Sequence, residues 1–375
     1  MLLSKRPALA RLMTVVQSSC QSRVCTFSST SSSYDASSSP NASSVASSFL
    51  SRFQSQGPQT RTQVLDANQL QLLSLTLDRP TLYPGTSDLS RNAPPPPNGT
   101  PVPPGYHLVY FTPAFLEHEL GADGTDTSYN PDAPFTRRMW AGGEVRWPRD
   151  ANGKPNLLRV GQEVKETTRV LSAEPKVVRK TGEEMIVVGV EKTFENEDGV
   201  AVVDQRNWVF RKALTSPPPA PNQQQTTSAP SPASSSSSSD PSSAGKKKIH
   251  KRSFCRSPVT LFRFSALTFN PHKIHYSVPW ARDVEGHKNI VVHGPLNLIS
   301  ILDLWRDVRQ EERSKSDDDE SSLISVPQSI SYRATSPLYA DEEYEIVLED
   351  LGHESKVNIY DHDGVIAMKA DIKES

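Results

Sequence analysis

Cysteine is scarce in this sequence of 375 residues, which has only Cys20, Cys25 and Cys255. Three cysteines at these positions form neither a disulfide framework nor a zinc ribbon, which excludes a small cross-linked fold. Long apolar runs are also missing, since no segment approaches the roughly 18–20 apolar residues that a membrane-spanning helix needs. Net charge is small, at −2, which argues against nucleic acid as a partner. We therefore expect a soluble protein without membrane insertion, acting on small molecules or other proteins.

Acidic residues are absent from the first 34 residues, although Lys5, Arg6, Arg11 and Arg23 are present. Apolar residues alternate with these cations and a serine-rich run follows. This pattern is typical of an organelle transit peptide, whereas a secretory signal would need a continuous apolar segment. We expect residues 1–34 to direct the chain to the mitochondrial matrix; the alternative is a disordered basic tail.

Hydrophobic residues make up only 35% of the chain and prolines number 31, so the folded part must lie in blocks. Residues 35–105 are rich in serine and proline and are expected to be disordered. A short amphipathic helix over 62–77 and a polyproline spacer over 94–104 interrupt this segment. Residues 214–252 are predicted to be a second disordered stretch, a Pro/Ser/Gln linker that ends in the solvated basic cluster 245–252.

The two remaining blocks, residues 106–213 and 253–375, share one pattern. In the first, strands are predicted at 185–190 and from 200 toward 210, with helical material before them. In the second, an apolar segment at helical spacing over 296–305 precedes strands at 344–349, 356–360 and 365–370. Each block is therefore predicted to be an antiparallel sheet wrapped around a central helix, which gives an α+β fold.

Histidines carry the clearest chemical signal of the second block. His272 and His275 lie three residues apart, and His287 and His293 follow. A zinc site is the weakest interpretation, because no Asp or Glu stands at a recognised ligand spacing. A structural role in the core and acid–base chemistry near the ordinary histidine pKa remain equally open from spacing alone.

The stretch Phe264–Tyr276, which contains Phe269-Asn270-Pro271-His272-Lys273-Ile274-His275, resembles the MaoC-like, R-specific enoyl-thioester hydratases of the hot-dog fold. It is most similar to the branch that includes mesaconyl-CoA-type hydratases and fungal mitochondrial type 2 hydroxyacyl-thioester dehydratases. Val291–Leu296 resembles the family's second motif. Arg138–Gly143 and Gln205–Arg211 resemble its non-catalytic N-terminal repeat. The resemblance implies a double hot-dog, with 106–213 as the non-catalytic repeat and 253–375 as the catalytic one.

The resemblance also implies roles for residues. His275 would be the acid/base, oriented with the water by His272 and Asn270, while His293 and Gly294 would hold the thioester at a helix N-terminus. The family's usual pattern, Asp-x-Asn-Pro-x-His-x-Asp, places its first Asp at Asn270, and Ser277 stands where most relatives have Asp. The carboxylate of the usual Asp/His pair is thus missing. Asp283 and Glu285 are candidates for a substitute carboxylate, and Arg263, Lys273 and Tyr276 are candidates for contact with the acyl group or the carrier.

The activity that the resemblance implies is dehydration of (3R)-hydroxyacyl thioesters in mitochondrial type II fatty acid synthesis, without metal or cofactor. Acyl-ACP or acyl-CoA would be the substrate, and an acyl carrier protein a candidate partner. Two alternatives stay open: hydration of a branched dicarboxyl-CoA such as mesaconyl- or itaconyl-CoA, and a catalytically weakened hot-dog protein that acts as a binding or scaffold module. Since two repeats in one chain can imitate a hot-dog dimer, we expect a monomer or a homodimer.

Overall fold

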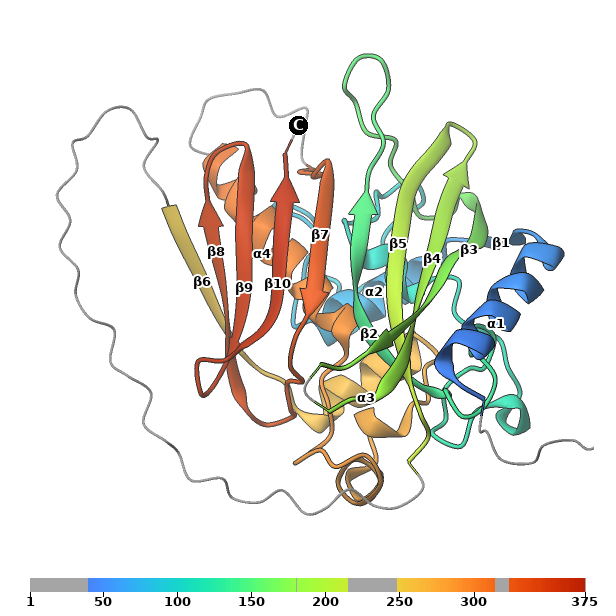
Figure 1. The fold of residues 1–375 in the computed structure, drawn as a ribbon. Coiled ribbons are helices and arrows are strands. Elements are labelled where there is room, and N and C mark those ends of the chain that lie inside the picture. The colour runs from blue at the N-terminus through green and yellow to red at the C-terminus, as the bar shows by residue number, and fades with distance from the viewer. Residues whose placement is uncertain (1–39, 180, 215–247, 314–323, 375) are drawn as a thin grey trace, which may run out of the picture. The chain divides into compact units, whose positions relative to one another are not determined.

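The computed structural model describes residues 40–179, 181–214, 248–313 and 324–374 (Figure 1). The expected transit peptide and most of the expected linker 214–252 lie outside these residues. Within them, buried and exposed side chains alternate along several strands, most regularly in β8 (Glu343–Asp350). Such a strand covers a core with one face and meets solvent with the other.

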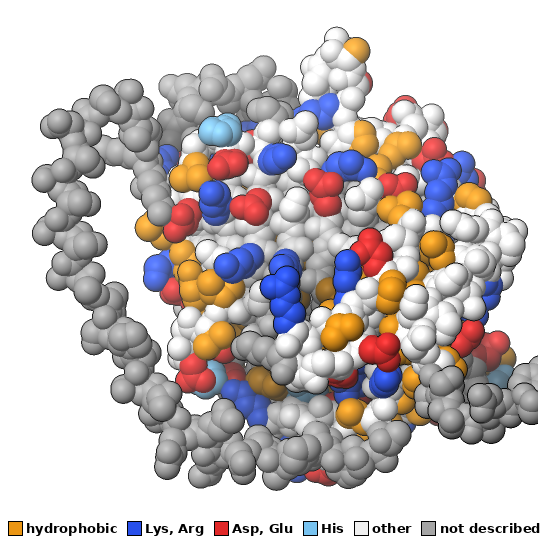
Figure 2. All heavy atoms as spheres, in the orientation of Figure 1, with side chains coloured by type: hydrophobic (Ala, Val, Ile, Leu, Met, Phe, Trp, Pro, Cys, Tyr) orange, Lys and Arg blue, Asp and Glu red, His pale blue; other side chains and the backbone are white. Residues whose placement is uncertain are grey.

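Ten strands form one sheet in which every neighbouring pair is antiparallel, in the order β1-β3-β4-β5-β2-β7-β10-β9-β8-β6. Its strands are β1 (Gln59–Val64), β2 (Arg137–Arg146), β3 (Glu163–Val177), β4 (Glu184–Asn196), β5 (Gly199–Arg211), β6 (Lys248–Cys255), β7 (Ser329–Ala334), β8, β9 (Glu354–Asp361) and β10 (Ile366–Lys373). Residues 59–211 supply the first five strands in that order, and residues 248–373 supply the other five, so β1 and most of β6 add to the expected repeats 106–213 and 253–375. The strands expected at 344–349, 356–360 and 365–370 lie within about a residue of β8, β9 and β10. Figure 2 shows charged side chains of both signs interspersed on the sheet face turned away from the helices.

The two repeats join where β2 pairs with β7 over Gly142–Arg146 and Ser329–Arg333. The register of β2 against β5 shifts between Trp140 and Gly142, so Ala141 forms a bulge there. Gly142 has φ 156°, and a Cβ on it would lie 2.4 Å from the carbonyl oxygen of Tyr332. Only glycine therefore allows these two strands to approach as they do.

Helix α4 (Gly294–Arg313) fills the concave side of the C-terminal repeat. The expected helix over 296–305 is confirmed and extends further in the C-terminal direction. Pro295 suits the first turn, because that position needs no backbone N–H. Eleven of the twelve residues from Leu296 to Asp307 are buried, all but Asp307, which makes α4 a central core helix rather than a surface helix.

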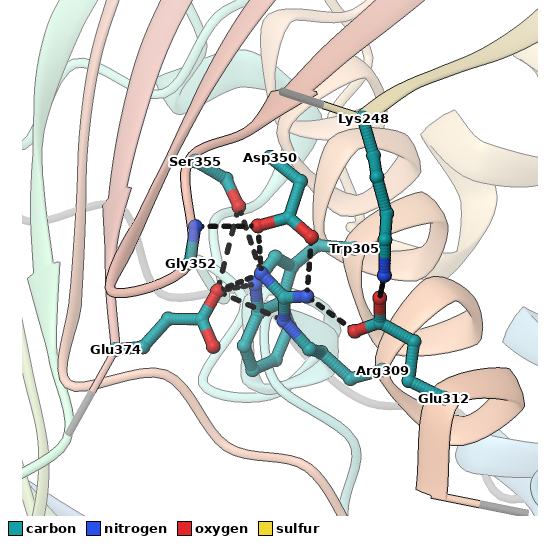
Figure 3. Close-up of polar contacts among 8 residues, drawn as sticks. All are labelled: Lys248, Trp305, Arg309, Glu312, Asp350, Gly352, Ser355 and Glu374. Carbon is teal, nitrogen blue, oxygen red and sulfur yellow. Dashed lines mark hydrogen bonds and ion pairs between the residues drawn. The ribbon is translucent and has the colours of Figure 1, made fainter. Parts of the chain in front are cut away.

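The C-terminal half of α4 is anchored by Arg309, which Figure 3 shows among three carboxylates. Its guanidinium donates to Asp350 at 2.8 and 2.9 Å and to Glu312 at 2.6 Å, and it also binds Glu374. Trp305 donates its indole N–H to Glu374 at 3.1 Å. This cluster ties α4 to the turn between β8 and β9 and to the end of the chain.

In the N-terminal repeat, several shorter elements take the place of one long helix. Helix α1 (Ala42–Gln56) packs Val45 and Phe49 against Ile186, Val188 and other buried residues of β4 and β5. The remaining helical elements are α2 (Ala67–Thr76), α3 (Pro258–Leu267), the 3₁₀ turns η1 (Tyr106–Val109), η2 (Glu117–Glu119) and η3 (Lys273–His275), and the π-helical turn η4 (Trp280–Val284). Helix α2 and η1 join the core that surrounds α4.

The expectation of disorder over 35–105 is wrong for the described part of that segment. Residues 42–76 form α1, β1 and α2, so the helix expected over 62–77 begins later, after a strand. The polyproline stretch is no free spacer either, since the Val102 N–H donates to the Leu158 carbonyl at 2.8 Å and Val102 is buried. Serine-rich composition misled because α1 turns its serines mainly outward while its few apolar residues meet an existing sheet.

The basic end of the expected linker is also ordered, because residues 248–255 form the edge strand β6 beside β8. Lys248 pairs with Glu312 at 2.6 Å, Lys251 with Glu345 at 2.9 Å and Arg252 with Asp307 at 2.9 Å. The cations thus neutralise carboxylates of α4 and β8 and blunt an exposed sheet edge. Among the described residues, no helix is long and apolar enough to cross a membrane.

Candidate functional site

His275 ends the short turn η3, between α3 and α4, and only 7% of its surface is exposed. Its Nδ1 lies 2.7 Å from the carbonyl oxygen of Val291. Because a carbonyl can only accept, Nδ1 carries the proton and Nε2 keeps its lone pair. The second motif, 291–296, therefore fixes the tautomer of His275 through its backbone.

His293 immediately precedes α4 and stacks on His275, with ring centroids 3.6 Å apart and planes 19° from parallel. Its Nε2 is 2.9 Å from the Ser265 hydroxyl on α3, and its Nδ1 has no partner. His293, expected at the thioester, lines the cavity, and its ring stacks on His275 and limits how that ring can turn.

His272 begins η3 and is buried to the same degree as His275, with the two rings nearly perpendicular and their centroids 5.4 Å apart. Its Nε2 has no hydrogen-bond partner and lies 3.7 Å from a carboxylate oxygen of Asp123. The side chain of Asn270 accepts the His272 backbone N–H at 3.3 Å, which shapes the turn into η3. The structure thus brings His275, His272, His293 and Asn270 together, as expected.

All three histidines are neutral at physiological pH. Burial lowers the pKa of His272 to about 3, helped by the positive charge of Arg138 and by His287. Burial likewise lowers the pKa of His275 to about 3, with His272 adding to the effect although the Val291 carbonyl opposes it. Burial and the other two histidines also lower the pKa of His293 well below its usual value. Neutral imidazoles can accept protons, so His275 is available as a base.

Asp123 could not be predicted from the sequence as a neighbour of His272, because it lies in a loop of the N-terminal repeat about 150 residues earlier. Its backbone carbonyl accepts the Lys273 N–H at 2.8 Å, and the Lys273 ammonium donates to the Ala122 carbonyl at 2.7 Å. The next residue, Gly124, has φ 85°, and a Cβ on it would lie 2.2 Å from the Pro271 carbonyl oxygen. The N-terminal repeat therefore holds the histidine segment in place, and a loop Asp-Gly pair was the only sequence signal of this contact.

A cavity of about 840 Å³ opens over the histidines and extends into the N-terminal repeat. His275, His272, His293, Asn270 and Gly294 all line it. Gly294 begins α4, whose first backbone N–H groups have no acceptor within the helix. A side chain at Gly294 would project toward Trp140, with a Cβ 3.4 Å from its ring, so the glycine accommodates Trp140.

The residues proposed for the acyl pocket do not line this cavity. Arg263 is exposed on α3, Tyr276 is 47% exposed, and Lys273 is held by Ala122 and by the ring of Trp280 at 4.4 Å. The sequence could not distinguish these side chains from inward-facing ones, because all three lie on or beside short helical turns.

The two substitute carboxylates do not reach the histidines. Asp283 is exposed, and Glu285 lies 3.7 Å from Arg137 and lines a neighbouring cavity. Within the described part of the chain, no cluster of three or more His, Cys, Asp or Glu residues has the arrangement of a metal site.

In a comparison with known protein families, residues 105–340 match the family hydroxyacyl-thioester dehydratase type 2. The chain is 28% identical over 218 residues to the mesaconyl-C(4)-CoA hydratase of Chloroflexus aurantiacus, covering 56% of this chain and 68% of that protein. It is 24% identical over 274 residues to the mitochondrial hydroxyacyl-thioester dehydratase type 2 of Schizosaccharomyces pombe, covering 68% and 80%.

Two solved structures resemble the fold. A MaoC-like dehydratase from Phytophthora capsici superposes with a TM-score of 0.50 at 13% identity, over 85% of this chain and 95% of that one. The peroxisomal multifunctional enzyme type 2 of Drosophila melanogaster gives 0.51 at 12% identity, over 92% of this chain and 54% of that one. These likenesses support the α+β double hot-dog fold and carry no residue roles.

Proposed function

Because this chain belongs to the hydroxyacyl-thioester dehydratase type 2 family and is therefore a hydro-lyase, we propose that it interconverts (3R)-hydroxyacyl and 2-enoyl thioesters at His275. The observation that carries this assignment is the 2.7 Å contact of its Nδ1 with the Val291 carbonyl. That contact leaves a neutral Nε2 lone pair at the wall of the cavity. The exchange of water across a double bond requires a base in this state.

In the dehydration direction, Nε2 of His275 removes the proton from the carbon next to the thioester carbonyl. The electron pair moves onto the thioester oxygen, and the resulting enolate then expels the hydroxyl group from the next carbon. The proton taken by His275 passes to that hydroxyl, so the products are the enoyl thioester and water. Hydration is the same sequence in reverse.

The enolate oxygen needs hydrogen-bond donors, and the N-terminus of α4 offers them. Since Pro295 has no N–H, the backbone amides of Gly294 and Leu296 are the available donors of the first turn. The helix dipole adds a positive end at the same place. His272, whose Nε2 is unpartnered, orients the water or the leaving hydroxyl in place of the usual carboxylate.

The test is hydration of crotonyl-CoA by the purified chain, followed as loss of enoyl absorbance, with chiral analysis of the product. His275→Ala should lower kcat by a factor of about 10² to 10⁴, the usual contribution of a general base. His353→Ala, which removes an exposed histidine on the turn between β8 and β9, should not change it. Full activity in His275→Ala would refute the assignment, and inactivity of the unmodified chain toward all enoyl thioesters would favour a scaffold role.

Mitochondrial fatty acid synthesis on an acyl carrier protein is the pathway proposed for this activity. It is supported by the name of the Schizosaccharomyces pombe relative and by the acid-free, cationic character of residues 1–34. A reporter protein fused to residues 1–34 should enter mitochondria; a cytosolic reporter would contradict this part. Hydration of a dicarboxyl-CoA requires a cation in the acyl pocket, and Arg263 and Lys273 do not supply it.

A further inference from the structure

The segment that carries His272 is held against a loop of the N-terminal repeat by backbone contacts. The Lys273 N–H donates to the Asp123 carbonyl at 2.8 Å. The next residue of the loop, Gly124, lies so close to the histidine segment that a Cβ on it would be 2.2 Å from the Pro271 carbonyl oxygen. The backbone of Asp123 is therefore fixed relative to η3 by a contact at the residue itself and by one at its neighbour.

The carboxylate of Asp123 is turned toward His272 by the loop that carries it. Its Oδ1 accepts the Thr125 backbone N–H at 2.9 Å and the Thr125 hydroxyl at 2.8 Å. Thr125 is buried and only 12% of the Asp123 side chain is exposed, so these bonds lie largely out of water. The second oxygen, Oδ2, is left to face Nε2 of His272 at 3.7 Å.

His272 presents a nitrogen without a partner at this point. Its Nε2 is enclosed by protein and makes no hydrogen bond within the described residues. A buried polar atom in this state is unfavourable and calls for a functional explanation. The 3.7 Å contact with Asp123 is too long for a hydrogen bond, but contacts in active sites are often long before the substrate binds and shorten in the reacting complex.

A carboxylate that faces Nε2 decides which nitrogen of the His272 ring carries the proton. Because carboxylate oxygens only accept, their negative charge favours the tautomer with its proton on Nε2. Nδ1 then keeps its lone pair and can accept a hydrogen bond from a water molecule or a hydroxyl group. This tautomer is the opposite of that in His275, whose Nδ1 carries the proton.

Asp123 reaches the ring from outside the catalytic cavity. His272 lines the cavity of about 840 Å³, whereas Asp123 lines the neighbouring cavity of about 830 Å³. Glu285 also lines that second cavity, but it faces Arg137 at 3.7 Å. A substrate in the catalytic cavity therefore meets His272, and Asp123 stands behind it.

We propose that Asp123 is a positioning residue, supplied by the N-terminal repeat, that holds His272 with its Nδ1 lone pair available to the substrate. Asp123 thereby takes the place of the carboxylate that is missing at Asn270. It acts only through His272 and exchanges no proton with the substrate. This inference rests on the proposed function, because it explains how that site orients the water or the leaving hydroxyl.

The first measurement is hydration of crotonyl-CoA by the purified full chain carrying Asp123→Asn. The amide keeps an oxygen for Thr125 and turns an N–H toward Nε2, so the His272 ring must accept there and carry its proton on Nδ1. The kcat should fall about 10- to 100-fold, as for loss of the partner that orients a histidine. KM should change by less than about twofold, because the interaction matters in the transition state.

Asp132→Asn is the matched control. Asp132 lies in the same connection between η2 and β2, its side chain is 67% exposed, and it pairs with Arg52 at 3.3 Å. Neither kcat nor KM should change in this variant, because an exposed ion pair contributes little and Asp132 lies outside the catalytic cavity.

A role through His272 requires that the two substitutions are not additive. His272→Asn removes the ring that Asp123 faces, so in that background Asp123→Asn should lower kcat by less than about twofold further. The full additional loss would show that Asp123 supports the site by another route, and it would overturn the proposal. An unchanged kcat in a folded Asp123→Asn protein would overturn it as well.

The second measurement does not depend on turnover. The NMR signals of the ring nitrogens, assigned to His272 by their loss in His272→Asn, report which nitrogen carries the proton. We expect the proton on Nε2 in the unmodified chain and on Nδ1 in Asp123→Asn. A proton on Nδ1 in the unmodified chain would refute the role of Asp123, whether or not Asp123→Asn folds. If the expected tautomers are found but the unmodified chain hydrates no enoyl thioester, the proposed function fails while the pairing of Asp123 with His272 stands.

Discussion

The two repeats use the same fold but present buried polar groups in opposite states of charge to the cavity. In the C-terminal repeat, His272, His275 and His293 are buried and neutral beside the start of α4. In the N-terminal repeat, the buried groups are ionised and paired, as in Asp204 with Arg206. Neutral bases suit proton transfer, whereas fixed charges suit recognition and rigid support.

This difference follows from what covers the concave face of each half of the sheet. A single long helix fills the C-terminal half and presents its N-terminus to the cavity. The N-terminal half is covered by α1, α2 and η1, which leave polar strand residues exposed to the cavity between them. Both repeats therefore contribute to the cavity, one through the start of a helix and the other through polar strand residues.

The largest predicted effect is a loss of stability when a carboxylate is removed from the charged network of the N-terminal repeat. Burial alone would raise the pKa of Asp204, but Arg206 and His107 hold it well below its usual value, so the carboxylate is ionised. Asp204→Asn leaves the buried Arg206 without the carboxylate that it contacts twice. The free energy of unfolding at pH 7.5, measured in urea, should fall by about 3–5 kcal/mol.

Asp350→Asn provides the control for this loss in the C-terminal repeat. Arg309 would keep its contacts with Glu312 and Glu374 (Figure 3), so the cost should be about 1 kcal/mol. Equal losses in the two variants would show that the N-terminal charges have no special dependence on Asp204.

The second prediction concerns the contact by which one repeat positions the other. Gly124→Ala places a Cβ against the Pro271 carbonyl oxygen, in a backbone conformation that alanine rarely adopts, and must displace the η3 segment. Misplacement of His275 by about 1 Å would lower kcat for crotonyl-CoA about 100-fold. Gly153→Ala has a similarly positive φ of 76° but nothing within 4 Å, and its kcat should stay unchanged. A full kcat in Gly124→Ala would mean that the loop does not position the histidines.

The sequence predicted the C-terminal repeat better than the N-terminal one, for a physical reason. Helix α4 and strands β8 to β10 carry strong local periodicity, and the histidines belong to a short contiguous motif. The segment containing α1 and β1 has weak periodicity and is ordered by contacts with β3 and β4, which lie about 100 residues or more away. The composition of such a segment indicates how much conformational entropy its ordering costs. It does not show that a sheet is present against which the segment can pack.

The same limit explains the errors at the site. Asp123 reaches His272 from a loop of the N-terminal repeat, and Trp140 reaches the cavity from β2, which pairs with β7 of the other repeat. Lys192 follows Glu191 in β4, and Arg206 lies between the polar residues Gln205 and Asn207 in β5, so alternation alone could not show that these two cations face inward. Arg263 and Lys273 are near His275 in the sequence, but the helical turns that carry them point their charges away from the cavity.

The smallest predicted effect tests whether the buried histidines of the C-terminal repeat are neutral, through the pH dependence of the free energy of unfolding. The pKa of His272 is about 3 in the folded chain and near 6.5 when unfolded, so between these values only the unfolded state binds the proton. Stability is therefore complete above about pH 6.5 and decreases as the pH falls toward 3.

His272→Asn, which restores the residue of the usual family pattern, removes one such proton. The slope of the unfolding free energy against pH, measured in urea between pH 5 and 6, should decrease by about 1.4 kcal/mol per pH unit, whereas exposed His353→Ala should leave it unchanged. An unchanged slope in His272→Asn would mean that this histidine is protonated in the folded protein, and the contrast between a neutral and a charged repeat would not hold at that residue.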